Sequence, residues 1–130
     1  MSVENGKIEG DVKEYYDNGS LYMERPFQNN QENGVRRTYY ESGKPKQEII
    51  VVNGILEGTA KEFYETGVLM KETPYLHGDK EGIMKVYYEN EVLKEETPYK
   101  RDKKDGVSKE YYNTGQLRKE TVYKLDQKVE

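Results

Sequence analysis

Five glutamates spaced 24 residues apart are the first candidates for a binding site in this chain. They are Glu24, Glu48, Glu72, Glu96 and Glu120. On successive hairpins of a sheet such residues would stand about 10 Å apart, which is twice the strand spacing. This acidic ladder could bind basic groups of a partner or a cation, but isolated carboxylates at that spacing do not make a calcium site, which needs about six to eight oxygens. The simpler interpretation, which we favour, is that the glutamates satisfy Lys and Tyr groups within the sheet.

A column of tyrosines and a column of basic residues repeat with the same spacing. The tyrosines are Tyr16, Tyr40, Tyr64, Tyr88 and Tyr112. The basic residues are Lys13, Arg37, Lys61, Lys85 and Lys109. Tyrosine is rigid, amphipathic and common at interface hot spots, so we expect the tyrosine column to be an exposed partner-binding face. The basic column is the alternative site, for phosphoinositide or other anionic lipid head groups, although the acidic ladder and the net charge of −4 oppose this.

Catalytic chemistry has weaker candidates. His77 is the sole histidine and lies in a polar connection, so we interpret it as an ordinary exposed loop residue. Its counterparts in the other copies are Asn29, Asn53, Arg101 and Leu125. No triad, metal cluster or paired-acid site stands out from the repeats, and the lack of cysteine excludes a disulfide scaffold and a thiolate nucleophile. We therefore expect no enzyme activity, no cofactor and no metal.

The composition indicates a folded but thin structure. Only 33% of residues are hydrophobic and the mean hydropathy is −1.13, yet there are 13 tyrosines, whereas disordered segments are poor in aromatics. The tyrosines must supply much of the buried apolar area, with their hydroxyls near water. No apolar run has the length of a membrane-spanning helix, and residues 1–10 lack the apolar stretch of a signal peptide, so we expect a cytoplasmic protein. The negative net charge argues against nucleic acid as the main partner.

Glycines at a constant interval divide the chain into repeats. They are Gly10, Gly34, Gly58, Gly82 and Gly106, each 24 residues after the one before. An uninterrupted period of this kind marks a repeat architecture. The sequence predicts one domain over residues 1–130, with a partial copy at 1–9 and full copies at 10–33, 34–57, 58–81, 82–105 and 106–129. The partial first copy leaves open whether a leader or further repeats precede it.

Each copy has the pattern of a strand, a turn and a strand when its opening glycine is counted as position zero. Position eight includes Thr, and a β-branched residue resists the positive φ that a two-residue type I′ turn requires. We therefore favour a three-residue turn with a glycine bulge, which sets Tyr15 opposite Leu21. The type I′ alternative would set Lys13 opposite Glu24. Strand alternation then predicts positions five, eleven and seventeen on one face and positions six and fourteen on the other.

Short polar connections join the hairpins. They span 28–33, 53–57, 76–81 and 100–105, and they are too short for a crossover helix. The predicted fold class is all-β: a repeat protein whose single-layer antiparallel meander, of about five hairpin repeats and roughly ten strands, forms an elongated twisted ribbon. Open edge strands at both ends leave homo-oligomer formation possible.

The pattern G-x-x-K-x-Y-Y-x-x-G-x-L-x-x-E resembles the MORN-repeat variant family, and specifically its bacterial antitoxin-type members. Residues 106–117, GVSKEYYNTGQL, fit it closely, and the resemblance covers the chain from Asn5 onward. It implies a scaffold or binding module, since MORN modules occur in scaffolds, in membrane-junction proteins and beside the catalytic domain of plant phosphatidylinositol-phosphate kinases. This chain has no kinase motif, so a kinase-like label would describe the module only. The resulting hypotheses are a non-enzymatic protein-binding module of antitoxin or immunity type and, as the alternative, a phosphoinositide-binding module.

Overall fold

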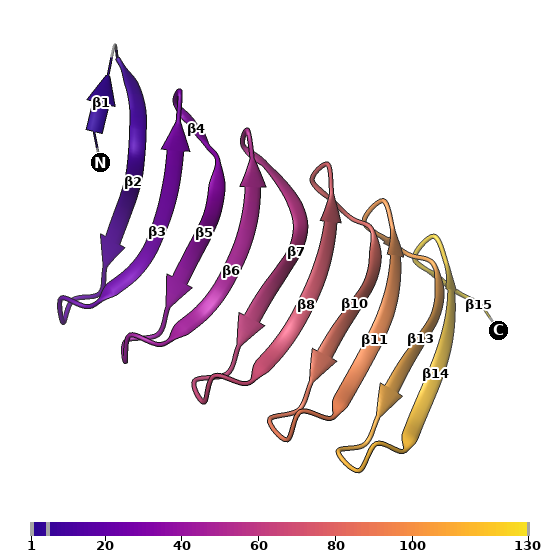
Figure 1. The fold of residues 1–130 in the computed structure, drawn as a ribbon. Coiled ribbons are helices and arrows are strands. Elements are labelled where there is room, and N and C mark those ends of the chain that lie inside the picture. Colours follow the sequence, from indigo (N-terminus) through magenta and orange to yellow (C-terminus); the bar gives the residue numbers. More distant parts are fainter. Residues whose placement is uncertain (1, 5, 130) are drawn as a thin grey trace.

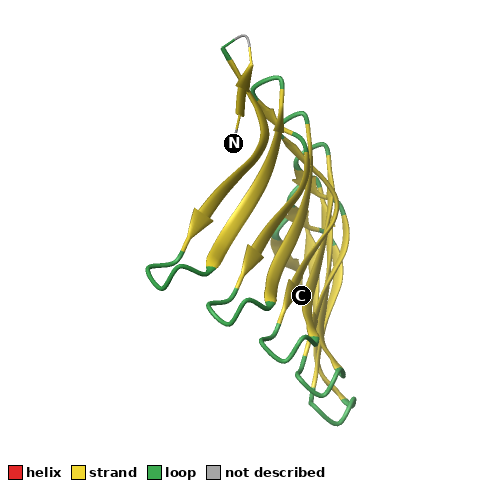
Figure 2. Ribbon diagram, turned by 60° about the vertical axis from the view of Figure 1, so that its left-hand side comes forward, coloured by secondary structure: helices red, strands yellow, loops and turns green. Residues whose placement is uncertain are grey.

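The computed structural model describes residues 2–4 and 6–129, which form one antiparallel sheet of fifteen strands. The strands are β1 (Ser2–Glu4), β2 (Lys7–Tyr15), β3 (Leu21–Gln28), β4 (Gln31–Glu32), β5 (Gly34–Tyr39), β6 (Pro45–Val52), β7 (Ile55–Phe63), β8 (Leu69–Leu76), β9 (Asp79–Lys80), β10 (Gly82–Tyr87), β11 (Leu93–Lys100), β12 (Lys103–Lys104), β13 (Gly106–Tyr111), β14 (Leu117–Lys124) and β15 (Gln127–Val129). Successive hairpins lie side by side in an elongated ribbon (Figure 1), and the strands curve along their length (Figure 2). The predicted all-β repeat ribbon is confirmed. None of the described residues forms a helix that could cross a membrane.

The long hairpins turn through three residues, as predicted. In the first of them the Tyr16 amide donates to the Ser20 carbonyl at 2.8 Å, and Tyr15 lies opposite Leu21. Gly19 closes the turn with a φ of 91°. The fourth full copy has Glu91 at this position, with a φ of 71°. In the other copies a glycine occupies this position, and glycine adopts the left-handed conformation without strain.

A β-bulge next to the turn changes the faces that the sequence predicts. After Tyr15 and Leu21, the next pair in the ladder is Glu14 and Met23, so Tyr22 is an extra residue. The same shift occurs in the other four long hairpins. Lys13 therefore lies opposite Glu24 although the turn has three residues. Because one extra residue reverses the alternation, position fourteen shares a face with position five, and position seventeen lies on the other face with position six. The predicted placement of positions fourteen and seventeen is wrong.

The connections contain two-residue turns, a feature on which the sequence analysis made no prediction. In the β8–β9 hairpin, Leu76 lies opposite Asp79, and the turn residues His77 and Gly78 have φ of 51° and 89°. Two consecutive positive φ values are the signature of a type I′ turn. The Gly78 amide donates to the carbonyl of Leu56 in the preceding copy at 2.9 Å, and equivalent bonds recur along the ribbon. These turns therefore fix each hairpin to its neighbour.

The two faces of the sheet differ in burial. One face carries positions two, four, fifteen and seventeen, and we call it the buried face. It holds the described residues that are almost inaccessible: Thr38, Val51, Ala60, Thr73, Met84 and Thr97. The other carries positions one, three, five, fourteen, sixteen and eighteen, and we call it the open face. The core of the ribbon is thus a single layer of side chains on the buried face.

Glu91→Gly should stabilise the protein by about 1 kcal/mol, because glutamate is strained at a φ of 71° where the other copies have glycine at 90–94°. Urea denaturation followed by circular dichroism measures the difference. Glu89→Gly, in the same turn but without positive φ, is the matched control and should not stabilise. Equal stability of Glu91→Gly and the natural protein would contradict the assigned strain.

Candidate binding surface

A ladder of alternating charges runs across the open face. The glutamates at position fourteen and the basic residues at position three lie opposite one another in register on successive strands. Their order along the ribbon is Lys13, Glu24, Arg37, Glu48, Lys61, Glu72, Lys85, Glu96, Lys109 and Glu120. Opposite charges facing each other across strands stabilise a sheet. The ladder therefore balances its own charge, which leaves the basic column without the excess positive charge that an anionic head group requires.

The ladder glutamates also accept hydrogen bonds from tyrosines at position five of the next copy. The hydroxyl of Tyr39 donates to Glu24 at 2.7 Å, that of Tyr87 to Glu72 at 3.1 Å, and that of Tyr111 to Glu96 at 3.2 Å. Phe63 occupies this position in the third copy and offers no donor. The simpler interpretation of the glutamates, as partners of groups within the sheet, agrees with this geometry.

Burial and the hydrogen bond to the Glu24 carboxylate raise the pKa of Tyr39 to about 12. A tyrosine whose pKa is higher in the folded state stabilises the fold fully below its ordinary value near 10, and loses that contribution as the pH rises toward 12. We therefore expect the free energy of unfolding to decrease between pH 10 and 12, and to decrease less in the Tyr39→Phe variant than in the natural protein. Unfolding by urea at several pH values measures it. An unchanged slope in Tyr39→Phe would contradict the assignment.

The tyrosines at position six tie adjacent copies together. The hydroxyls of Tyr16, Tyr40, Tyr64 and Tyr88 donate to the backbone carbonyls of Tyr39, Phe63, Tyr87 and Tyr111, at 2.5–2.7 Å. Lys46 and Lys94 cover the rings of Tyr40 and Tyr88, with Nζ 5.6 and 5.4 Å from the ring centroids. Tyr112 is the exception, since it is half exposed and its hydroxyl has no such acceptor among the described residues. Four of the five predicted partner-binding tyrosines thus have a structural role inside the ribbon.

His77 is part of a turn. Its backbone amide and its Nδ1 lie 2.9 and 2.8 Å from Oε1 of Glu57 in the preceding copy. The amides of Asn29 and Leu125 make the equivalent contact, to Glu9 and Asp105. The imidazole therefore shares a carboxylate that already holds a turn. The described residues contain no group of three or more His, Asp and Glu side chains placed to hold a metal ion.

Sequence reasoning missed a band of exposed apolar side chains on the open face. This apolar band consists of Ile50, Val52, Ile55, Leu76, Ile83, Val107 and Val122. Val52 lies directly opposite Ile55, and Val107 opposite Val122, so the side chains meet across strands. The recurring apolar residues at positions one, sixteen and eighteen were visible in the sequence, but the unrecognised bulge concealed which face they share.

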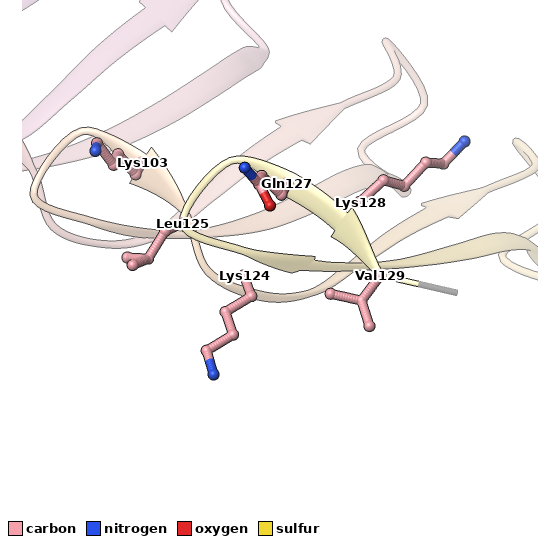
Figure 3. A pocket seen from close by; sticks show the side chains of 6 residues that line it. All are labelled: Lys103, Lys124, Leu125, Gln127, Lys128 and Val129. Atoms are coloured by element: carbon pink, nitrogen blue, oxygen red, sulfur yellow. The ribbon is translucent and has the colours of Figure 1, made fainter.

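The C-terminal end of the ribbon carries a shallow hollow of about 820 Å³. Its lining residues are Lys103, Lys124, Leu125, Gln127, Lys128 and Val129. Figure 3 shows Lys124, Leu125 and Val129 pointing to one side of the sheet and Lys128 to the opposite side. Lysine and apolar side chains are therefore mixed on this side of the C-terminal end.

The recurring hairpin, with its opening glycine, paired aromatic residues and position-fourteen glutamate, has a known counterpart. A comparison with curated proteins gives no match. The sequence pattern described as the MORN repeat variant matches residues 8–29, 32–53, 56–77, 80–101 and 104–125, which together make up most of the chain. The chain therefore belongs to the MORN repeat variant family.

Proposed function

We propose that this chain is a non-enzymatic protein-binding module that binds its partner with the open face of the sheet. The observation that supports this is the apolar band, in which Ile55, Leu76 and Ile83 are 48%, 48% and 52% exposed. These apolar side chains lie on the open face and not on the buried face, where the core of the sheet is. MORN repeats are commonly scaffold modules that bind proteins or lipids. Burying the exposed half of each of these three side chains against a partner would contribute about 1 kcal/mol apiece.

A phosphoinositide-binding role has less support. Lys61 and Lys85, at the centre of the basic column, each lie between two glutamates of the ladder. A flat anionic membrane that contacted this face would meet five carboxylates together with five cations. The partner-binding surface therefore lies in the apolar band rather than in the basic column.

The partner can be captured from the cells that produce this chain, and its affinity then measured with both proteins purified. Ile55→Asp with Leu76→Asp should weaken binding by at least 100-fold and change the melting temperature by only a few degrees, because both side chains face solvent. Tyr112→Asp, which changes an equally exposed side chain at the other face, should bind normally. Unchanged binding by the double variant would remove the open face as the site.

The more specific form of this function is neutralisation of a toxic protein, which the family resemblance implies. In that case the captured partner should arrest growth when expressed alone, and co-expression of this chain should restore growth. Co-expression of the Ile55→Asp and Leu76→Asp double variant should not. A partner that is harmless alone would leave general scaffolding as the function.

A further inference from the structure

One column of the open face changes its chemistry along the ribbon. In each full copy, positions eighteen and twenty-one lie directly opposite each other beside the two-residue turn. From the N-terminal to the C-terminal end these pairs are Gln28 with Gln31, Val52 with Ile55, Leu76 with Asp79, Lys100 with Lys103, and Lys124 with Gln127. The column is therefore polar and neutral at first, apolar in the middle except for Asp79, and basic at the end.

The basic part of this column is not neutralised by the fold. Lys100 lies directly opposite Lys103, and like charges at such positions destabilise a hairpin. Both side chains line a hollow of about 400 Å³, whose other lining residues are Arg101, Lys124, Leu125 and Asp105. Among the described residues no carboxylate forms an ion pair with any of the three lysines, whereas the charge of Arg101 favours the ionised form of the Asp79 carboxylate. A ligand that supplied negative charge here would relieve the repulsion.

The acidic residues near this hollow already accept hydrogen bonds, including Asp105 in its lining, which accepts from the backbone amide of Leu125 at 3.4 Å. Asp102 and Asp126 each accept a backbone amide of the preceding copy, from Lys80 at 2.7 Å and from Lys104 at 2.8 Å. The chain as a whole also separates its charge. Residues 100–130 contain nine Lys or Arg and six Asp or Glu, whereas residues 1–99 contain twelve and nineteen. The C-terminal end thus attracts an acidic partner that the rest of the ribbon repels.

We propose that the partner presents a segment whose apolar residues contact Val52, Ile55 and Leu76 and whose acidic residues contact Lys100, Lys103 and Lys124. This inference rests on the proposed function and specifies the chemistry of the partner. The apolar pair and the lysine pair are two copies apart, or about 20 Å at the usual strand spacing. An extended segment covers this distance with about six residues. The sequence feature to seek in the partner is therefore an apolar cluster and an acidic cluster separated by about six residues.

Selection of random 16-residue peptides on the intact 130-residue chain tests this directly. We expect the enriched peptides to combine an apolar cluster with an acidic one at this separation. Fluorescence anisotropy should show at least tenfold weaker binding of such a peptide to Lys100→Glu with Lys103→Glu. Lys44→Glu with Lys46→Glu is the matched control, which changes the net charge equally at a distant turn and should bind normally. A peptide with lysines in place of its acidic residues should prefer the Lys100→Glu and Lys103→Glu variant.

Each other outcome contradicts the inference, and each also shows whether the proposed function still holds. Peptides that require Ile55 and Leu76 but bind the Lys100→Glu and Lys103→Glu variant normally overturn it and leave the proposed function standing. Peptides that ignore both surfaces, or the absence of enriched peptides, overturn both. Binding to vesicles of phosphatidylserine and phosphatidylcholine without peptide binding would assign the lysines to a membrane. A dimer in sedimentation equilibrium that these two charge reversals dissociate would assign them to a second copy of the chain.

Discussion

Gly34→Ala should destabilise the protein by about 2–6 kcal/mol, although it adds only one methyl group. Gly34 has a φ of 131°, and a Cβ there would lie 2.8 Å from Cγ of Pro26 on the neighbouring strand. A backbone conformation of this kind costs an alanine about 1–3 kcal/mol, and forcing apart a packed contact costs about 1–3 kcal/mol more. Urea denaturation followed by circular dichroism measures the loss.

Two variants separate the conformational cost from the steric cost. Gly43 has a φ of 90°, and a methyl group added there would meet no atom within 4 Å, so Gly43→Ala should lose only about 1–2 kcal/mol. In a protein that already carries Pro26→Ala, Gly34→Ala should reduce stability less than it does in the natural protein, because the proline ring that the methyl group would meet is absent. Equal losses for Gly34→Ala and Gly43→Ala would show that close packing against Pro26 is not what requires the opening glycine.

The regular period explains how much of this fold the sequence predicts. A 24-residue repeat with an aromatic strand on each side of Gly19 is enough to predict a ribbon of hairpins. The Thr at position eight of some copies correctly indicated a three-residue turn, because that turn is determined by the conformations its own residues accept. Local backbone preference is information that a short stretch of sequence carries.

The faces of the sheet could not be predicted in the same way. They depend on the bulge at Leu21 and Tyr22, and neither residue type signals a bulge. Its effect extends through the rest of the strand, since one added residue exchanges the faces of all that follow. The acidic ladder therefore joined the face of the position-five tyrosines, and the apolar band was overlooked.

For the two-residue turns between hairpins, the sequence carries a turn signal in one copy and lacks it in others. Asn53 and Gly54 form a dipeptide typical of a type I′ turn, and it predicts the tight turn that the structure has there. In the equivalent turns Arg101 and Leu125 have φ of 48° and 49°, which neither residue type favours. Hydrogen bonds to the preceding copy hold these turns, so they follow from the array rather than from their own residues.

Removing two tyrosine hydroxyls from the middle of the ribbon should loosen the contacts between its copies. Tyr64→Phe with Tyr88→Phe deletes the hydrogen bonds to the carbonyls of Tyr87 and Tyr111. Each bond is worth about 1 kcal/mol, and each carbonyl left unpaired adds up to about 1 kcal/mol, so we expect a total loss of about 2–4 kcal/mol. Because each copy contacts only its neighbours, the urea transition should also broaden as the two ends unfold separately.

Tyr112→Phe is the matched control, since its hydroxyl has no such acceptor among the described residues, and it should change stability by less than about 0.5 kcal/mol. If it costs as much as Tyr64→Phe, the hydroxyl bonds do not join the copies.

The structural role of these tyrosines also limits how they can be tested as a binding face. Tyr64→Ala with Tyr88→Ala would also remove two half-buried rings, at about 2–4 kcal/mol each, which approaches the whole stability of a domain. Loss of a partner in that variant would then report unfolding, whereas Ile55 and Leu76 can be changed on a ribbon that stays folded.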